Sequence, residues 1–150
     1  MEVVQCQEMR EFNRLYKELD DIYHSVSARH GISDTVFIIL YSVYALGEGC
    51  SQKDIADFYF LPRQTINSAL KKLYAEHKVV LRASKGREQG IYLTSEGRAF
   101  ADEIILPVLC AENAAFADMD REEKKLFLEL NRKFNALLKE NLTCKHGGEK

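Results

Sequence analysis

The sequence of 150 residues has no tryptophan, only two prolines and no long uninterrupted hydrophobic run. A helix that spans a membrane needs about 20 mostly apolar residues, so no membrane segment is expected. The first residues, MEVVQCQEMREF, also lack the basic and then apolar pattern of a secretory signal peptide. These absences predict a cytoplasmic protein.

Cysteines and histidines are too scattered to indicate a metal or disulfide site. Cys6, Cys50, Cys110 and Cys144 form no C-x-x-C pair, which disfavours a zinc ribbon and a disulfide framework. The four histidines show no metal-ligand spacing on a shared face. We therefore expect free thiols, no bound metal and no cofactor.

The motifs of common enzyme classes are missing as well. The sequence has no G-x-S-x-G, no H-E-x-x-H, no P-loop and no glycine-rich dinucleotide turn. Two acidic pairs, Asp20-Asp21 and Glu122-Glu123, are adjacent within predicted helices, where neighbouring side chains do not face each other. No enzymatic activity is expected.

Charge is distributed unevenly along the chain. Residues 62–98 carry eight basic and three acidic residues, a net charge of +5, whereas the remainder carries thirteen basic and twenty acidic residues, a net charge of −7. The overall composition, 46% hydrophobic and 29% charged, is that of an ordinary globular domain. The asymmetry indicates an anionic partner for one segment only.

An amphipathic helix is predicted for residues 7–29, because apolar residues recur there at steps of three and four. These residues are Met9, Phe12, Tyr16, Leu19, Ile22, Tyr23 and Val26. Gly31 ends this helix, and Ser33 can cap a second one, DTVFIILYSVYALG, which is apolar on nearly all sides. The second helix is therefore expected to be buried at the centre of the fold.

A pair of short helices follows. Ser51 and Asp54 have the spacing of a capping box, which opens a third helix. Pro62 fits the first turn of a fourth helix, LPRQTINSALKKLYAEH, where its missing N–H costs nothing. The apolar face of the fourth helix contains Ile66, Ala69, Leu70, Leu73 and Tyr74, and the polar face contains Arg63, Gln64, Asn67, Ser68, Lys71 and Lys72.

The remaining residues predict a hairpin and two further helices. VVLRA and GIYLT are β-branched and aromatic runs on either side of a basic tip, SKGREQ. Thr94 can cap the next helix, and Pro107 should kink or break that helix near its middle. Asp120 and Glu123 can cap the last helix, whose apolar residues are Leu126, Phe127, Leu130, Phe134, Leu137 and Leu138.

The order of elements predicts a mainly α, single-domain protein with a winged helix-turn-helix core, α-α-α-α-β-β-α-α. We expect residues 34–98 to form the DNA-binding lobe of this domain, which spans residues 1–150. The helices within residues 7–30 and 99–142 have apolar faces but few other surfaces to pack against, so we expect them to pair with a second copy of the chain.

This pattern suits double-stranded DNA, because the second helix of such a motif enters the major groove. Arg63 could bond guanine, and Gln64 or Asn67 could bond adenine, through bidentate contacts. The predicted DNA-binding residues are Lys53, Arg63, Gln64, Thr65, Asn67, Ser68, Lys71, Lys72, Lys85 and Arg87. Among them the lysines on the helices suit phosphates, whereas Arg87 at the hairpin tip could enter the minor groove with Lys85 beside it.

The chain resembles the MarR family of transcriptional regulators over about residues 8–142. The resemblance lies in SQKDIADFYFLPRQTINSALKKLYAEHKVVLR, in IYLTSEGR and in FADMDREEKKLFLELNRKFNALLKENL. In that family these stretches are the helix-turn-helix, the wing followed by a Leu-Thr-x-x-Gly helix start, and the C-terminal dimerisation helix. Two positions depart from the family pattern: no aspartate precedes Arg87 in the wing, and His77-Lys78 follow the recognition helix where the family usually has glycine.

The resemblance implies a homodimer that binds a palindromic operator, often represses nearby genes, and releases DNA when a small phenolic ligand or an oxidant acts. The family's ligand cleft lies between the dimerisation helices and the DNA-binding lobe, so residues of the first two helices are the candidates. They are Tyr16, Tyr23, His24, Arg29, His30 and Tyr41. Cys6 is the candidate for a thiol sensor, because some relatives sense peroxides through a cysteine near the N-terminus.

A winged-helix protein that binds a partner protein without reading DNA is the alternative interpretation. The overall acidity of the chain and the missing wing aspartate favour this alternative. The polar face of the fourth helix and the basic segment favour DNA.

Overall fold

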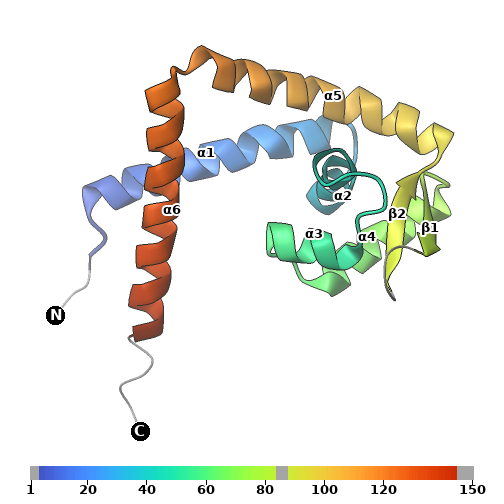
Figure 1. Ribbon diagram of the computed structural model, residues 1–150, viewed down its shortest axis with the longest axis horizontal. Coiled ribbons are helices and arrows are strands. Elements are labelled where there is room, and N and C mark those ends of the chain that lie inside the picture. The colour runs from blue at the N-terminus through green and yellow to red at the C-terminus, as the bar shows by residue number, and fades with distance from the viewer. Residues whose placement is uncertain (1–3, 84–87, 145–150) are drawn as a thin grey trace, which may run out of the picture. The chain divides into compact units, whose positions relative to one another are not determined.

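The computed structural model describes residues 4–83 and 88–144, with side chains up to Thr143, and its elements follow the predicted order (Figure 1). They are α1 (Gln7–Arg29), α2 (Asp34–Ala45), α3 (Gln52–Tyr59), α4 (Arg63–Ala75), β1 (Val79–Ala83), β2 (Gln89–Leu93), α5 (Ser95–Asp118) and α6 (Arg121–Cys144). The fold is mainly α, as predicted. No helix in the described ranges is both long enough and apolar enough to cross a membrane.

Contacts within the chain divide it into two compact units, residues 1–107 and residues 108–150. The first unit holds α1 to α4, the hairpin and the first half of α5. The second unit holds the end of α5 and α6.

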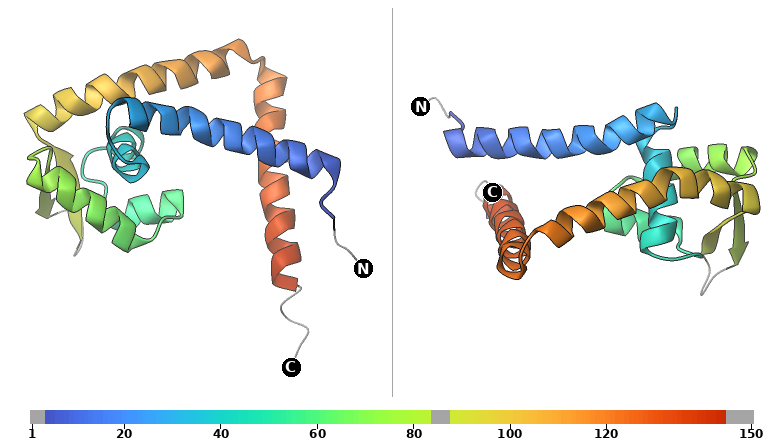
Figure 2. Two further views of the ribbon diagram at one scale, coloured as in Figure 1. Left: turned by 180° about the vertical axis from the view of Figure 1, so that it is seen from behind. Right: turned by 90° about the horizontal axis from the view of Figure 1, so that it is seen from above.

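The core of the first unit surrounds α2, which lies between the first half of α5 and the α3–α4 pair (Figures 1 and 2). Ile39 and Leu40 of α2 are fully buried, as the nearly uniform hydrophobicity of this helix predicts. They share the core with apolar side chains from α3, α4, the hairpin and α5, namely Ile55, Ile66, Leu70, Leu73, Val79, Ile91, Ala101, Ile104 and Ile105.

Local capping residues set the starts of the helices, and most were recognisable in the sequence. The Ser33 side chain accepts a hydrogen bond from the Val36 N–H at the start of α2. At α3 the capping box is complete, because the Asp54 N–H donates to Ser51 Oγ and the Ser51 N–H donates to Asp54 Oδ2. Pro62 is the N-cap of α4 rather than a residue of its first turn, so this prediction was wrong by one position.

The hairpin pairs antiparallel, with Val79 opposite Leu93 and Ala83 opposite Gln89. The loop before α3 adds a short third pairing, because the Gly49 N–H donates to the Ile91 carbonyl and the Ile91 N–H donates to the Cys50 carbonyl. Gly90 is required at this crossing, since a Cβ there would lie 2.7 Å from the Gly49 carbonyl oxygen. The hairpin is thereby fastened to the helix-turn-helix.

The start of α5 is capped as predicted, because the Gly97 N–H donates to Thr94 Oγ1. The predicted break at Pro107 was wrong, since α5 continues through this proline from Ser95 to Asp118. A proline removes one backbone hydrogen bond from a helix, and the turns on either side here remain helical.

The second unit consists mainly of α6, whose first turn has a reciprocal cap. The Glu123 N–H donates to Asp120 Oδ1, and the Asp120 N–H donates to Glu123 Oε2. Within the described part of this unit only Val108, at its start, is buried. Many apolar side chains therefore remain exposed, namely Phe116, Leu126, Phe127, Leu128, Leu130, Leu137, Leu138 and Leu142.

Candidate nucleic-acid interface

The two faces of α4 are clearly separated. Ile66, Leu70 and Leu73 are buried against the rest of the first unit. Tyr74, which the helical pattern places on the same face, is exposed, so this part of the predicted core was wrong. The polar side chains are exposed, with Asn67 half-buried; these are Arg63, Gln64, Thr65, Asn67, Ser68, Lys71 and Lys72.

Arg63, at the first position of α4, lies close to Glu88, which directly precedes β2 at the tip end of the wing. Its Nη2 is 3.7 Å from Glu88 Oε1, and the side chains are 59% and 43% exposed. A partly exposed ion pair of this kind contributes at most about 1 kcal/mol, so Arg63 can exchange Glu88 for another anionic partner. Lys53 lines the same small cavity of about 220 Å³ as Arg63 and Glu88, which brings two of the predicted basic contacts together.

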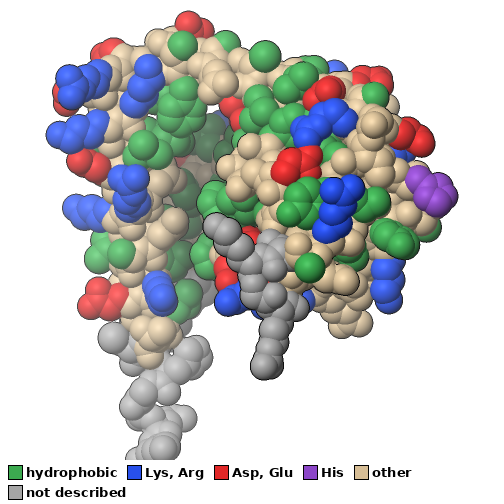
Figure 3. All heavy atoms as spheres, turned by 45° about the vertical axis from the view of Figure 1, so that its right-hand side comes forward, with side chains coloured by type: hydrophobic (Ala, Val, Ile, Leu, Met, Phe, Trp, Pro, Cys, Tyr) green, Lys and Arg blue, Asp and Glu red, His purple; other side chains and the backbone are tan. Residues whose placement is uncertain are grey.

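The wing tip lies outside the described residues, and Lys85 and Arg87 with it. In the space-filling view, basic and acidic side chains are interspersed over the first unit, at the right of the picture (Figure 3). The visible surface is therefore not a uniform basic patch.

The turn after α4 explains one departure from the family pattern. His77 has a φ of +55°, the left-handed conformation that favours glycine. The His77 N–H donates to the Tyr74 carbonyl and the Lys78 N–H donates to the Leu73 carbonyl at 2.9 Å, which is the hydrogen-bond pattern of a Schellman motif. The turn that glycine usually makes is thus formed with histidine at the left-handed position.

A cavity of about 390 Å³ lies between α1, α2 and the end of α3, all in the first unit. Four of the six predicted ligand-binding residues line it: Tyr16, Tyr23, His24 and Tyr41. The other residues lining it are Asp20, Ser27, Asp34, Phe37, Ile38 and Tyr59.

The remaining two predicted ligand residues do not line this cavity. The exposed Arg29 donates from Nε to the Ser25 carbonyl of its own helix at 3.2 Å. His30 is the C-cap of α1. Among the described residues, no arginine therefore lines this cavity.

Three thiols are described, and all are free. Cys6 and Cys110 are exposed, whereas Cys50 is buried. Burial, together with the nearby carboxylates of Asp54 and Glu48, raises the pKa of the Cys50 thiol to about 11. Within the described residues, no group of three or more His, Cys, Asp or Glu side chains could hold a metal ion.

We expect Cys50 to resist alkylation in the folded protein, because the thiolate is the reactive form and is scarce far below the pKa. Treatment with iodoacetamide at pH 7.5, followed by peptide mass spectrometry, should label Cys6 well before Cys50. In urea, where burial is lost, both should react at similar rates. Equal rates in the folded protein would contradict the burial of Cys50.

Several residues of these sites were not recognised from the sequence. In the sequence Glu88 is only part of the predicted hairpin tip, and its proximity to Arg63 depends on the packing of the wing against α4. Asp34 and Ser27 gave no sequence signal beyond a helix start and a helix end. The local spacing of residues does not show which helix faces will meet.

Comparison with solved structures identifies the fold. A MarR family regulator from Neisseria meningitidis has a TM-score of 0.78, with 15% identity over 93% of this chain and 99% of that chain. A protein from Listeria monocytogenes, described as a MarR family transcriptional regulator and complexed with 26mer DNA, has a TM-score of 0.67, with 18% identity over 100% of this chain and 99% of that chain. Staphylococcus aureus MarR in complex with salicylate and kanamycin has a TM-score of 0.65, with 16% identity over 89% and 91%.

No family model matches the sequence, and no curated protein matches it either. The similarity is thus one of structure, and it shows that the chain has the winged-helix fold of MarR family regulators.

Proposed function

We propose that this chain is a transcriptional regulator of the MarR type, which binds a palindromic DNA operator as a homodimer and acts as a repressor. The polar face of α4 carries the proposal. It presents Arg63, Gln64 and Lys71 to solvent, while the opposite face is anchored in the core by Ile66 and Leu70. A helix held in this way can enter a major groove without loss of packing.

The structural similarity supports DNA as the binding partner. The Listeria neighbour, which resembles this chain along its whole length, was solved with DNA. By analogy, α4 would be the recognition helix, and the hairpin would contact the adjacent minor groove. Lys53, Lys71 and Lys72 would bind phosphates, which position the protein without specifying sequence. Arg87 at the hairpin tip would enter the minor groove, with Lys85 beside it.

The exposed apolar residues of the two end helices support the homodimer. On α1 they include Leu15, Tyr16, Leu19 and Ile22, and α6 adds a longer set. Contiguous apolar surface of this kind is rarely left in water. In a two-fold dimer the same surfaces would cover each other and would hold two copies of α4 about 34–36 Å apart.

A regulator of this type would release DNA in response to a signal. A small ligand in the cavity beside α2 is the signal that we favour, and oxidation of Cys6 is the second. Staphylococcus aureus MarR, one of the structural neighbours, was solved with salicylate and kanamycin. The cavity adjoins both α1 and α3, so a ligand there would affect the dimerisation arm and the helix-turn-helix together.

Selection of bound sequences from a random duplex pool tests the proposal. The wild-type protein should enrich an inverted repeat. The triple variant Arg63→Ala, Gln64→Ala, Asn67→Ala should fail to select it and should bind it about 100-fold more weakly or worse, since each bidentate base contact contributes about 1–3 kcal/mol.

Lys71→Ala is the matched control on the same helix. Removal of a phosphate contact should weaken binding to all sequences and lower the slope of log affinity against log salt by about one, while the selected sequence stays the same. If a folded wild-type dimer enriches nothing at low salt, the DNA-binding proposal is wrong. The protein–protein interaction module would then be preferred, and the proximity of the acidic Glu88 to Arg63 is the observation that favours it.

A further inference from the structure

The cavity between α1, α2 and α3 is acidic and aromatic. Two carboxylates line it, those of Asp20 and Asp34, and none of the described residues lining it is lysine or arginine. Four tyrosines also line it: Tyr16, Tyr23, Tyr41 and Tyr59. A phenolic or carboxylic anion would therefore meet charges of its own sign, whereas a cation would be attracted.

Asp34 is ionised at neutral pH. Burial acts to raise its pKa, but the neighbouring His24, Ser27 and Lys17 together outweigh burial and hold the pKa below the usual value. Of these, His24 has its Nδ1 3.0 Å from Asp34 Oδ2. This carboxylate belongs to the first turn of α2. It supplies a fixed negative charge on one side of the cavity.

The positive charges close to the cavity do not cancel its acidic character. Lys17 lies 2.7 Å from Asp20 and 3.4 Å from Asp21, so one ammonium is shared between two carboxylates of α1. Lys17 also acts at longer range on Asp34. Three carboxylates, those of Asp20, Asp21 and Asp34, therefore lie around this single lysine.

A buried hydroxyl adds a polar anchor. Ser27 is fully buried and lines the cavity, and its Oγ has no hydrogen-bond partner among the described residues. It lies close enough to Asp34 to favour the carboxylate form, although the geometry of a hydrogen bond is not met. A buried polar group without a partner is costly, and a ligand N–H could bond to this oxygen.

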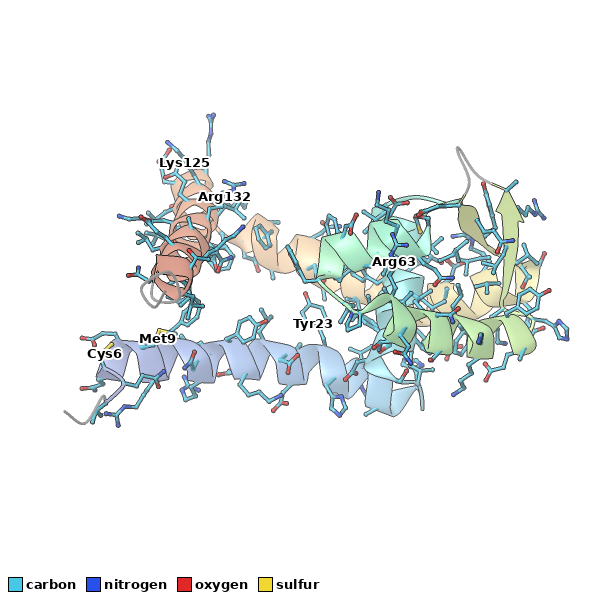
Figure 4. The ribbon with its side chains drawn as sticks, turned by 90° about the horizontal axis from the view of Figure 1, so that it is seen from below. Cys6, Met9, Tyr23, Arg63, Lys125 and Arg132 are labelled. Atoms are coloured by element: carbon cyan, nitrogen blue, oxygen red, sulfur yellow. The ribbon has the colours of Figure 1, made fainter. Side chains whose placement is uncertain are left out.

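The rings provide an apolar body for the site. Tyr23 and Tyr41 flank Phe37, with ring centroids at 6.2 Å and 5.9 Å from its centroid. Tyr23 projects from α1 toward the side on which the helix-turn-helix lies (Figure 4). The faces of tyrosine rings attract cations, and about 390 Å³ is sufficient for a ligand with two fused rings.

We propose that this cavity binds a protonated aromatic amine, and that cations of this class, rather than phenolic anions, are the effectors of the protein. The ammonium would lie between Asp20 and Asp34 with an N–H directed to Ser27, and the ring system would pack on the tyrosines. The proposal that an amine binds here depends only on the structure of the cavity. The role of the amine as an effector rests on the proposed DNA-binding function.

Three compounds of nearly equal shape and different charge test the binding. They are 2-naphthylmethylamine, 2-naphthalenemethanol and 2-naphthoate, each titrated into the full chain by isothermal calorimetry at pH 7.5. The amine should bind about tenfold more tightly than the alcohol, and the carboxylate should bind most weakly. Tighter binding of the carboxylate, or no binding of the amine at millimolar concentration, would overturn the proposal.

Neighbouring carboxylates on α1 give a matched pair of variants. Asp20 lines the cavity and Asp21 does not, yet both contact Lys17. Asp20→Asn should weaken amine binding about fivefold, and Asp21→Asn less than twofold. Equal effects would mean a diffuse surface charge and would refute the site.

Asp34→Asn should also weaken the amine, but Asp34 starts α2 and its loss could affect folding. If Asp34→Asn is unstable, Asp20→Asn remains the test of the site, because Asp20 is exposed. The effector role is tested separately, by release of the selected duplex. Amine binding without release would refute the effector role alone, and DNA binding without amine binding would refute the site while leaving the proposed function intact.

Discussion

The variant Leu130→Glu is expected to be a monomer and to bind the selected inverted repeat at least about 100-fold more weakly than the wild type. Leu130 is 53% exposed in the single chain. At 100° per residue it lies on one stripe of α6 with Leu126, Phe134 and Leu137. A glutamate at the centre of that stripe would have to be buried at the two-fold interface, and twice in each dimer, which is costly without a partner.

The loss of DNA affinity follows from the loss of pairing. A dimer binds its second half-site as an intramolecular step at high effective concentration, whereas a monomer must bind each half-site separately. Light scattering coupled to size-exclusion chromatography would report the mass, and fluorescence anisotropy with the selected duplex would report the affinity.

Leu128→Glu is the matched control. Leu128 is also exposed, at 42%, but it lies on the opposite side of α6, where Lys125 and Arg132 also project (Figure 4). The same substitution at this position should leave a dimer with nearly unchanged affinity. If Leu128→Glu dissociates the protein as fully as Leu130→Glu does, or if Leu130→Glu remains dimeric, the stripe is not the interface.

The elements of the fold were predictable because their signals are local. A serine or threonine cap acts on an N–H within three residues, so Ser33, Ser51 and Thr94 marked their helices correctly without any knowledge of packing. The errors arose where tertiary context decides. Pro107 lies within a continuous helix, and Tyr74 follows the helical pattern of the core but lies beyond its edge.

The candidate sites were predictable only in part. The exposed face of α4 followed from helical periodicity, since buried and exposed positions alternate with a known repeat. The cavity forms only where three helices meet, and no local pattern indicates that Asp34 and Ser27 lie beside Tyr16 and Tyr23 there. The family resemblance implies a phenolic ligand, whereas the two carboxylates that line the cavity favour a cation.

The close packing around Gly97 explains why the Leu-Thr-x-x-Gly element ends in glycine. A Cβ at this position would lie 1.7 Å from the Lys78 carbonyl oxygen. That oxygen cannot easily move, because it accepts a hydrogen bond from the Thr94 N–H at 3.0 Å. Thr94 Oγ1 also donates to the His77 carbonyl at 2.7 Å while it accepts from the Gly97 N–H. The start of α5 is thus locked onto the turn between α4 and β1.

Gly97→Ala is therefore expected to lower the free energy of unfolding by about 3 kcal/mol, which is large for a single methyl group. The direction of this change is informative, because replacing glycine by alanine inside a helix ordinarily raises the free energy of unfolding by about 1 kcal/mol. Urea unfolding followed by circular dichroism, at equal protomer concentration because a dimer is expected, would measure the change.

Gly31→Ala separates steric overlap from backbone strain. Gly31 has a φ of +64°, but a Cβ there would meet nothing within 4 Å. That variant should lose only about 1 kcal/mol, the cost of a left-handed conformation for alanine. A Gly97→Ala protein as stable as the wild type would show that α5 can shift away from Lys78. In that case the connection between the wing and α5 would be flexible, and α5 could move without moving the wing.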